Sequence, residues 1–339
     1  MKRNYGFDLA RIFLCLCVIT LHSITNFEIN NGIVFNIVLT ILAQANGVFY
    51  MLSGYFNLEK EFKNSTDIKK YYKNKFIYIL FPFLAFLFVW AVWDYLHINE
   101  TFNVLDFLWY YYELVIDTSS NGHLWFLYPL FGMLLATPFL SKMLHNMDDK
   151  ELKTLWRIAI GWNVLYYFLC LDINLDFGLS GWFLISWPIY YFIGYYYRHV
   201  ISKESTLKWA ILGVFGFVGT IVCPLFMKRF EGTNDMQPLF TLFCIGCLLF
   251  WDKTFKINDG KLSKVIVFLS SQTFLIYLYH MRGMEYALRK LPVGEASLGT
   301  GLAIVFGTFV FSLIAAIVTN LVMKPVQKFM DKKWIIKEK

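Results

Sequence analysis

The sequence predicts an all-α integral membrane protein with about ten transmembrane helices and both termini in the cytoplasm. Three observations favour this fold class. Hydrophobic residues make up 58% of the 339 positions and charged residues only 16%, whereas soluble domains are about half apolar and about a quarter charged. The apolar residues gather in runs of about 20, the length that a helix needs to cross the hydrocarbon core. Aromatic residues reach 20% of the chain, as expected for lipid-facing surfaces and interfacial belts.

Ten apolar runs are the candidates for these helices. In order along the chain they are residues 7–27, 33–56, 76–97, 123–141, 154–171, 179–198, 207–227, 236–251, 264–281 and 300–324. The alternating pattern of β-barrel strands is absent from the sequence, so a helical bundle is the predicted architecture. We found no internal repeat and no separate soluble domain, and residues 1–339 are predicted to form a single membrane domain.

The basic residues predict the orientation. The loop at 57–75 has six lysines, whereas the loop at 98–122 has four acidic residues and no basic one. Cytoplasmic loops are enriched in Lys and Arg, so both termini are predicted to be inside, which requires an even number of spans. The net charge of +7 is then explained by cytoplasmic loops that face anionic inner-leaflet lipids, and it does not indicate binding to nucleic acid. Of the 31 basic residues, the predicted outer loops contain Lys228, Arg229, Arg282, Arg289 and Lys290.

Two of the connecting segments have the composition of segments that lie on a membrane surface. The lysine-rich segment at 57–75 is predicted to be amphipathic on the cytoplasmic face. The segment FNVLDFLWYYYELVID, within 98–122, is compatible with an interfacial helix on the outer face, rich in Tyr and Trp.

The first apolar run carries three ionisable residues, Asp8, Arg11 and His22. Eleven residues of helix advance about 16 Å and rotate through three turns plus about 20°, so Arg11 and His22 share one face at opposite depths. A buried ionisable group costs a few kcal/mol in a membrane and usually faces an interior cavity. We therefore interpret His22 as a functional residue and Asp8 as the partner of Arg11. For Asp8 an interfacial ion pair at the helix start is an equal alternative.

This first helix resembles that of the membrane acyltransferase-3 family, in which FDLAR is followed by a helix ending in LH, with an Arg-x10-His spacing. Further segments agree in the same order along the chain. They are NGVFYMLSGYF at 46–56, KNKFIYILFPF at 73–83, GHLWFLYPLFGMLLATPFL at 122–140, YYFIGYYYRHV at 190–200 and TFLIYLYH at 273–280. The resemblance covers nearly the whole chain, and the ten-span topology of the family agrees with the predicted one.

The resemblance implies an O-acyltransferase. Members of the family move an acyl group, most often acetyl, from cytoplasmic acyl-CoA such as acetyl-CoA to a hydroxyl of a cell-surface or lipid-linked glycan. Their essential Arg and His correspond to Arg11 and His22. The family's Arg-x-x-Arg near the third helix is matched by Lys75 and Tyr78, so only the first position is basic, and Lys73 is the candidate substitute. The implied location is a bacterial cytoplasmic membrane, among membrane lipids.

These residues suggest how the chemistry would be divided between the two sides. Arg11, Lys73 and Lys75 would line a cytoplasmic mouth and hold the CoA phosphates, although each lysine alone also fits a positive-inside loop. A neutral His22 would act as general base, taking the proton from the acceptor hydroxyl as that oxygen attacks the thioester carbonyl. Direct transfer is favoured over a covalent acyl-enzyme. Candidates for stabilising the oxyanion are Ser53, Asn46 and Asn26.

The acceptor side is predicted from residues at the outer helix ends. His123, with Trp125 beside it, and His280 lie at such ends, and Glu113 lies in an outer loop. Aromatic rings with polar neighbours suit a sugar, and an interfacial belt is the alternative interpretation. The histidines and acids lack ligand spacing on any one element, so no metal site is predicted.

Two other functions remain open at this point. A multi-pass transporter or flippase of a lipid-linked sugar would also have many helices, a basic inner face and buried polar residues. The third possibility is a non-catalytic sensor that keeps the acyltransferase scaffold, which the departure from Arg-x-x-Arg favours. Thioester consumption that depends on His22 would separate the enzyme from both.

Overall fold

The computed structural model describes residues 3–98, 101–117, 122–168, 187–226, 237–291 and 295–333, and every regular element in these ranges is helical. A π-helical turn, Phe76–Leu80, joins α3 to α4 in one continuous helix, and 3-10 turns follow α1 and precede α6. The predicted all-α class is therefore confirmed for these ranges. The helices are α1 Tyr5–His22, α2 Gly32–Asn57, α3 Ser65–Lys75, α4 Phe81–Ile98, α5 Val104–Ile116, α6 Leu127–His145, α7 Asp149–Tyr166, α8 Trp187–His199, α9 Thr206–Phe226, α10 Pro238–Thr254, α11 Lys261–Lys290 and α12 Leu298–Lys333.

In the described ranges, seven stretches of helix are long and apolar enough to cross a membrane, so the chain is a multi-pass membrane protein. They are Tyr5–His22, Gly32–Asn57, Ser65–Ile98, Gly122–His145, Thr206–Phe226, Lys261–Lys290 and Leu298–Lys333. The other three predicted spans overlap with α7, α8 and α10. α7 begins with the charged sequence DKELK, and α10 has 17 residues. Parts of the predicted spans at 154–171, 179–198, 207–227 and 236–251 lie outside the described residues.

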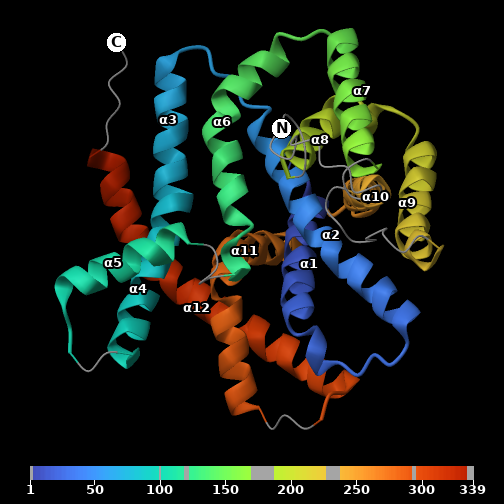
Figure 1. The fold of residues 1–339 in the computed structure, drawn as a ribbon. Helices are drawn as coiled ribbons and strands as arrows, with labels where there is room; N and C mark the ends of the chain where they lie inside the picture. The colour runs from blue at the N-terminus through green and yellow to red at the C-terminus, as the bar shows by residue number, and fades with distance from the viewer. Residues whose placement is uncertain are drawn as a thin grey trace.

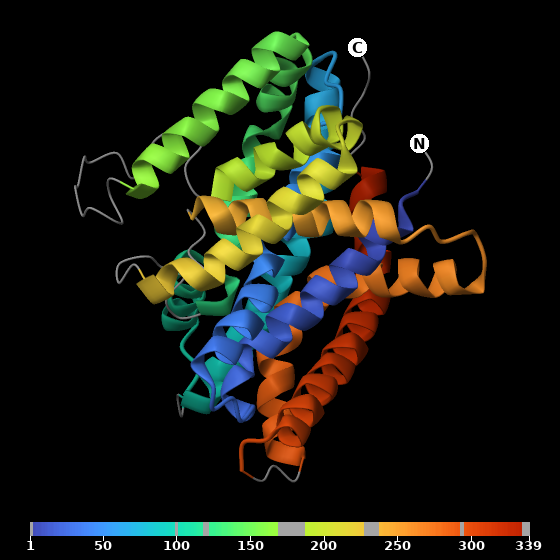
Figure 2. The same cartoon turned by 90° about the vertical axis from the view of Figure 1, so that its right-hand side faces the viewer.

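α1 packs against α2, α10, α11 and α12, and Figure 1 shows it near the middle of the molecule. The most extensive helix pairs are α11 with α12, α9 with α10, and α2 with α8. The start of α1 and the end of α12 both lie in the upper half of Figures 1 and 2, whereas α1 ends in the lower half. The two polar ends of α1 are thus separated by the length of this helix.

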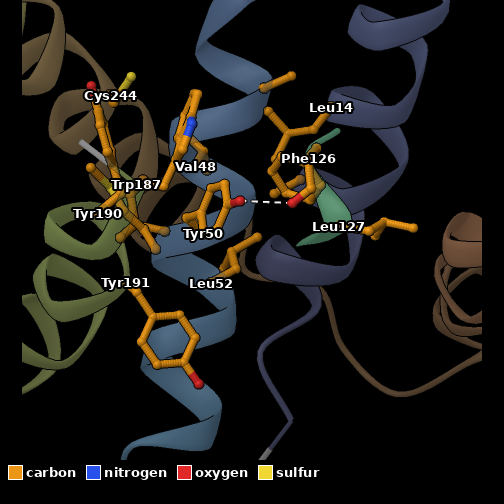
Figure 3. Packing of buried hydrophobic residues seen from close by; sticks show 14 of the residues in the cluster. Leu14, Val48, Tyr50, Leu52, Phe126, Leu127, Trp187, Tyr190, Tyr191 and Cys244 are labelled. Carbon is orange, nitrogen blue, oxygen red and sulfur yellow. Dashed lines mark hydrogen bonds between the residues drawn. The ribbon is translucent and has the colours of Figure 1, made fainter. Parts of the chain in front are cut away.

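Aromatic side chains fill the core between α2, α6 and α8 (Figure 3). The Tyr50 ring stacks on Trp187 at 5.1 Å between ring centroids, and its hydroxyl donates to the carbonyl of Phe126 at 2.7 Å. A buried tyrosine hydroxyl requires such a partner. Tyr50 therefore fixes the chain that leads into α6 against the middle of α2.

Each of the two connecting segments contains a helix, but α3 continues into α4 as one candidate membrane span. α3 begins with a capping box between Asn64 and Asp67 and has a single buried residue, Tyr71. α5 buries Phe107 and Leu114 and packs on α4, and its apolar residues on the other side are exposed, as in a helix that lies in a membrane interface. Figure 1 shows α5 at the edge of the bundle.

Candidate functional site

The start of α1 is organised around the buried carboxylate of Asp8, which is 2% exposed. Arg3 Nε donates to one of its oxygens at 2.6 Å, and Arg11 Nη1 lies 3.2 Å from the other. The hydroxyl of Ser270, on α11, donates to Asp8 at 2.9 Å. A buried charge requires such partners. The predicted pairing of Asp8 with Arg11 is thus present, and Arg3 and Ser270 are additional partners that the spacing did not indicate.

Arg11 faces the C-terminal end of α2. Its guanidinium carbon lies 4.9 Å from the centre of the Phe56 ring, and the next residue, Asn57, accepts a hydrogen bond from Lys75 Nζ at 2.7 Å. Phe7 packs edge-on against Phe56 as well. Arg11 and Lys75 therefore lie around the same end of α2, as the prediction of a common basic mouth requires.

Lys73 differs from Lys75 in having an acidic partner. Its Nζ lies 2.7 Å from a carboxylate oxygen of Asp331 and donates to the carbonyl of Asp331 at 2.8 Å. Asp331 lies in the last turn of α12. The ammonium of Lys73 thus ties α3 to the end of α12, and its charge is compensated within the protein.

At the opposite end of α1 the structure brings together His22, His123 and His280, hereafter the histidine cluster. The ring centroids of His22 and His280 are 5.1 Å apart, and those of His123 and His280 are 5.2 Å apart. His280 is 1% exposed, His123 is half-buried and His22 is exposed. The cluster is therefore open at His22 and closed at His280.

Within the part of the chain that the structure describes, two ring nitrogens of the cluster are buried without a hydrogen-bond partner, namely Nε2 of His123 and Nε2 of His280. Nδ1 of His280 lies 2.5 Å from the carbonyl oxygen of Tyr277, and the His123 ring is hydrogen-bonded to the backbone of Leu278. A carbonyl only accepts, so Nδ1 of His280 carries the proton and its Nε2 keeps a free lone pair. That nitrogen is suited to a ligand that donates hydrogen bonds.

The segment that carries His123 is held from two sides. The Tyr277 hydroxyl, on α11, donates to the carbonyl of His123, and the Tyr50 hydroxyl donates to Phe126 three residues later. Neither tyrosine was part of the predicted site. In an apolar run, the sequence does not distinguish a tyrosine that only fills the core from one whose hydroxyl positions a neighbouring segment.

Trp125 extends from the same segment toward α8. Its ring centroid lies 5.1 Å from that of Trp187, and Trp187 in turn stacks on Tyr50. Trp125 is half-buried, so part of its indole remains accessible. Paired aromatic rings of this kind offer an apolar platform to a flat or ring-shaped ligand.

Two predicted site residues lie elsewhere. The Ser53 carbonyl accepts a hydrogen bond from Asn57, which places Ser53 one turn from the residue that binds Lys75 and at the opposite end of α1 from His22. The reason is that the last turns of α2 pack beside the start of α1. Glu113 is exposed on α5, where its carboxylate accepts from Trp109 at 2.6 Å, and within the described residues it makes no ion pair with the histidine cluster.

An ion pair near the histidine cluster was not predicted. The guanidinium of Arg282, on α11, is paired with Asp94 on α4 and lies 4.6 Å from the centre of the Trp90 ring. The indole N–H of Trp90 is buried without a hydrogen-bond partner. From the sequence alone, Arg282 is only a basic residue of a predicted outer loop. The ion pair could not be predicted because Asp94 lies 188 positions away in the sequence.

These features define a class: a helical multi-pass membrane protein with a basic site at one end of α1 and a histidine cluster at the other. The chain belongs to the acyltransferase-3 family, whose acyltransferase domain matches residues 4–320. It is 24% identical over 352 aligned positions to an amino-acid racemase of Enterococcus faecalis. That alignment covers 95% of this chain and 47% of the racemase, so the chain spans about half the length of this curated relative. No solved structure matches the chain.

Proposed function

We propose that the protein is a membrane O-acyltransferase that moves an acyl group, most simply acetyl, from cytoplasmic acyl-CoA to a hydroxyl of a cell-surface or lipid-linked glycan. Membership of the acyltransferase-3 family supports the reaction class. The observation that carries the proposal is the histidine cluster, in which two buried Nε2 atoms have no hydrogen-bond partner among the described residues. A sugar hydroxyl supplies the hydrogen-bond donor that such a nitrogen lacks.

In this proposal the two ends of α1 bind the two substrates. Both termini are cytoplasmic, so the basic end around Arg11 receives the nucleotide part of the donor. Asp8 holds the Arg11 guanidinium in place through their ion pair, which makes Asp8 a positioning residue. The thin thioester arm then extends along α1 toward His22.

The transfer itself requires one base and one bound hydroxyl. His22 takes the proton of the acceptor hydroxyl while that oxygen attacks the thioester carbonyl. The carbon–sulfur bond of the tetrahedral intermediate then breaks, and the CoA thiolate leaves and receives a proton. His123 and His280 accept hydrogen bonds from the acceptor through their free Nε2 atoms, and Trp125 provides an apolar face for the sugar ring.

The experiment uses the full chain in lipid vesicles with acetyl-CoA labelled in the acetyl group and a crude surface-glycan extract. Release of CoA and transfer of label by wild type, lost in His22→Ala, is the expected result. The matched control is His97→Ala, because His97 is exposed on α4 against Trp93 and is not part of the cluster. Release that is equal in wild type and His22→Ala would contradict the role of His22. If the protein neither binds nor consumes acetyl-CoA, the acyltransferase proposal fails.

A further inference from the structure

Two lysines share one hydrogen-bond acceptor at the end of α2. Lys75 Nζ donates to the side-chain oxygen of Asn57 at 2.7 Å, and Lys60 Nζ donates to the same oxygen at 3.3 Å. Each ammonium also lies 5.2 Å from the centre of the Tyr71 ring. The two ammonium groups are thus close neighbours, because both bind the same oxygen of the neutral Asn57 amide and both lie over the Tyr71 ring.

No carboxylate compensates this lysine pair in the described part of the chain, since neither Lys60 nor Lys75 forms an ion pair there. Two acidic residues line the cavity beside the lysine pair, Glu61 and Asp67. Glu61 lies 3.7 Å from Lys63 Nζ, and Asp67 accepts from the backbone N–H groups that it caps at the start of α3. Both acids therefore have other partners.

Two other cations on neighbouring elements do have acidic partners. Lys73 is bound to Asp331 and Arg198 to Glu59. Desolvation by the surrounding protein lowers the pKa of Lys60, which is the expected effect on an ammonium without a counter-charge. Two like charges fixed so close to each other repel, and the repulsion is relieved by an anion that bridges them.

A cavity of about 550 Å³ adjoins the pair and is lined by both lysines, with Lys70, Tyr71 and Asn74 among its other walls. This volume lies within the range of small-molecule sites. Tyr78, which occupies the second position of the family's Arg-x-x-Arg, lines the same cavity. The helix thus has a tyrosine where the motif has its second cation, and Lys60, from the loop before α3, supplies a second cation to the same cavity.

We infer that Lys60 and Lys75 together bind a phosphate-bearing anion, and that in the full reaction this anion is the diphosphate of the CoA donor. The assignment rests on the proposed function. It replaces the expectation that Lys73 supplies the second charge, because the ammonium of Lys73 is occupied by Asp331. An anionic lipid headgroup presents the same phosphate chemistry, and the experiment distinguishes the two sources.

The test uses the full chain in nanodiscs of zwitterionic lipid, with inorganic pyrophosphate and CoA as probes. Thermal unfolding and CoA binding are measured for wild type, Lys60→Met, Lys75→Met, Lys60→Arg and Lys63→Met. Lys63 is the matched control, because it belongs to the same loop and is paired with Glu61. Bound ligand raises the unfolding temperature of the protein that binds it.

Wild type, Lys60→Arg and Lys63→Met are expected to be stabilised by both probes. Lys60→Met and Lys75→Met are expected to lose the pyrophosphate effect and to bind CoA about tenfold more weakly or worse, because a charge-assisted contact is removed. Without ligand, Lys60→Met should unfold at or above the wild-type temperature, since a repulsion is relieved. A purely structural Lys60 would instead give a less stable variant that still responds to pyrophosphate, and that result would overturn the inference.

Further outcomes distinguish a failure of the donor assignment from a failure of the proposed acyltransferase function. If anionic nanodiscs stabilise wild type through Lys60 while pyrophosphate and CoA do not, the pair binds lipid and the donor assignment is wrong. If wild type binds CoA through Lys60 but transfers no acyl group, the proposed function fails and the phosphate site stands. Acyl transfer by Lys60→Met with unchanged CoA affinity would refute the site alone.

Discussion

The imidazole rings of His22 and His280 lie 5.1 Å apart, although they come from the first helix of the chain and from α11. His22 is exposed at its end of α1, whereas His280 is 1% exposed and has a free Nε2. In the proposed reaction, the exposed ring of His22 would meet the two substrates, and the buried ring of His280 would bind the acceptor. The two histidines are expected to have different roles and separable kinetic effects.

Replacing the buried ring tests this division. In His280→Phe the volume is kept but the Nε2 acceptor is lost, so acyl transfer should fall about 100-fold or more while CoA binding at the other end of α1 stays unchanged. The measurements are label transfer and CoA affinity, with His97→Phe as the control on α4. Transfer at the wild-type rate by His280→Phe would show that the cluster does not bind the acceptor.

The buried carboxylate of Asp8 leads to a stability prediction. Asp8→Ala removes the counter-charge of the Arg11 guanidinium and the hydrogen-bond acceptor of the Ser270 hydroxyl. The free energy of unfolding should therefore fall by about 3 kcal/mol. Arg3→Met removes a half-exposed partner of the same carboxylate and should cost less than about 1 kcal/mol. Both are measured by unfolding in detergent. Equal losses in the two variants would show that Asp8 does not depend on its buried partners.

The sequence predicted best what lies within one helix. The spacing of Asp8, Arg11 and His22 depends only on helix geometry, and the Asp8–Arg11 contact is present. Helix ends alone did not predict which histidines lie near each other, since His97 also lies at the end of its helix but packs against Trp93. Which ring nitrogens remain free could not be predicted, since it depends on single carbonyls such as that of Tyr277.

Pairings between distant segments were beyond reach of the sequence. Lys73 has its partner in the last turn of α12, and Lys60 meets Lys75 only because both reach Asn57. Ser53 was grouped with His22 by chemistry alone, whereas the antiparallel course of α2 places it at the other end. The apolar runs located the helices, but hydropathy does not determine which side chains face each other.

The contact of α2 with α8 depends on glycine. A Cβ atom at Gly194 would lie 1.9 Å from the carbonyl oxygen of Met51, which a side chain cannot approach without backbone movement. Gly194→Ala should therefore separate the helices and reduce the free energy of unfolding by about 2 kcal/mol. Gly161→Ala on α7 is the control, since nothing lies within 4 Å of its Cβ position. Thermal unfolding in detergent compares the two, and a Gly194→Ala protein as stable as Gly161→Ala would contradict the close packing.

The pair of Arg282 and Asp94 links α11 to α4 beside the histidine cluster, with the guanidinium on the Trp90 ring. We expect Arg282→Met and Asp94→Asn each to lower the unfolding temperature. The double variant should unfold at a temperature no lower than that of the less stable single variant. The reason is that each single change already removes the contact between the two charges, even though Arg282 keeps Glu285 as a second partner. This gives a coupling energy of about 1 kcal/mol in a double-mutant cycle. Arg289→Met, at the exposed end of the same helix, should change stability little. Strictly additive losses would mean that the two side chains stabilise the protein independently, and the ion pair would then not hold α4 against α11.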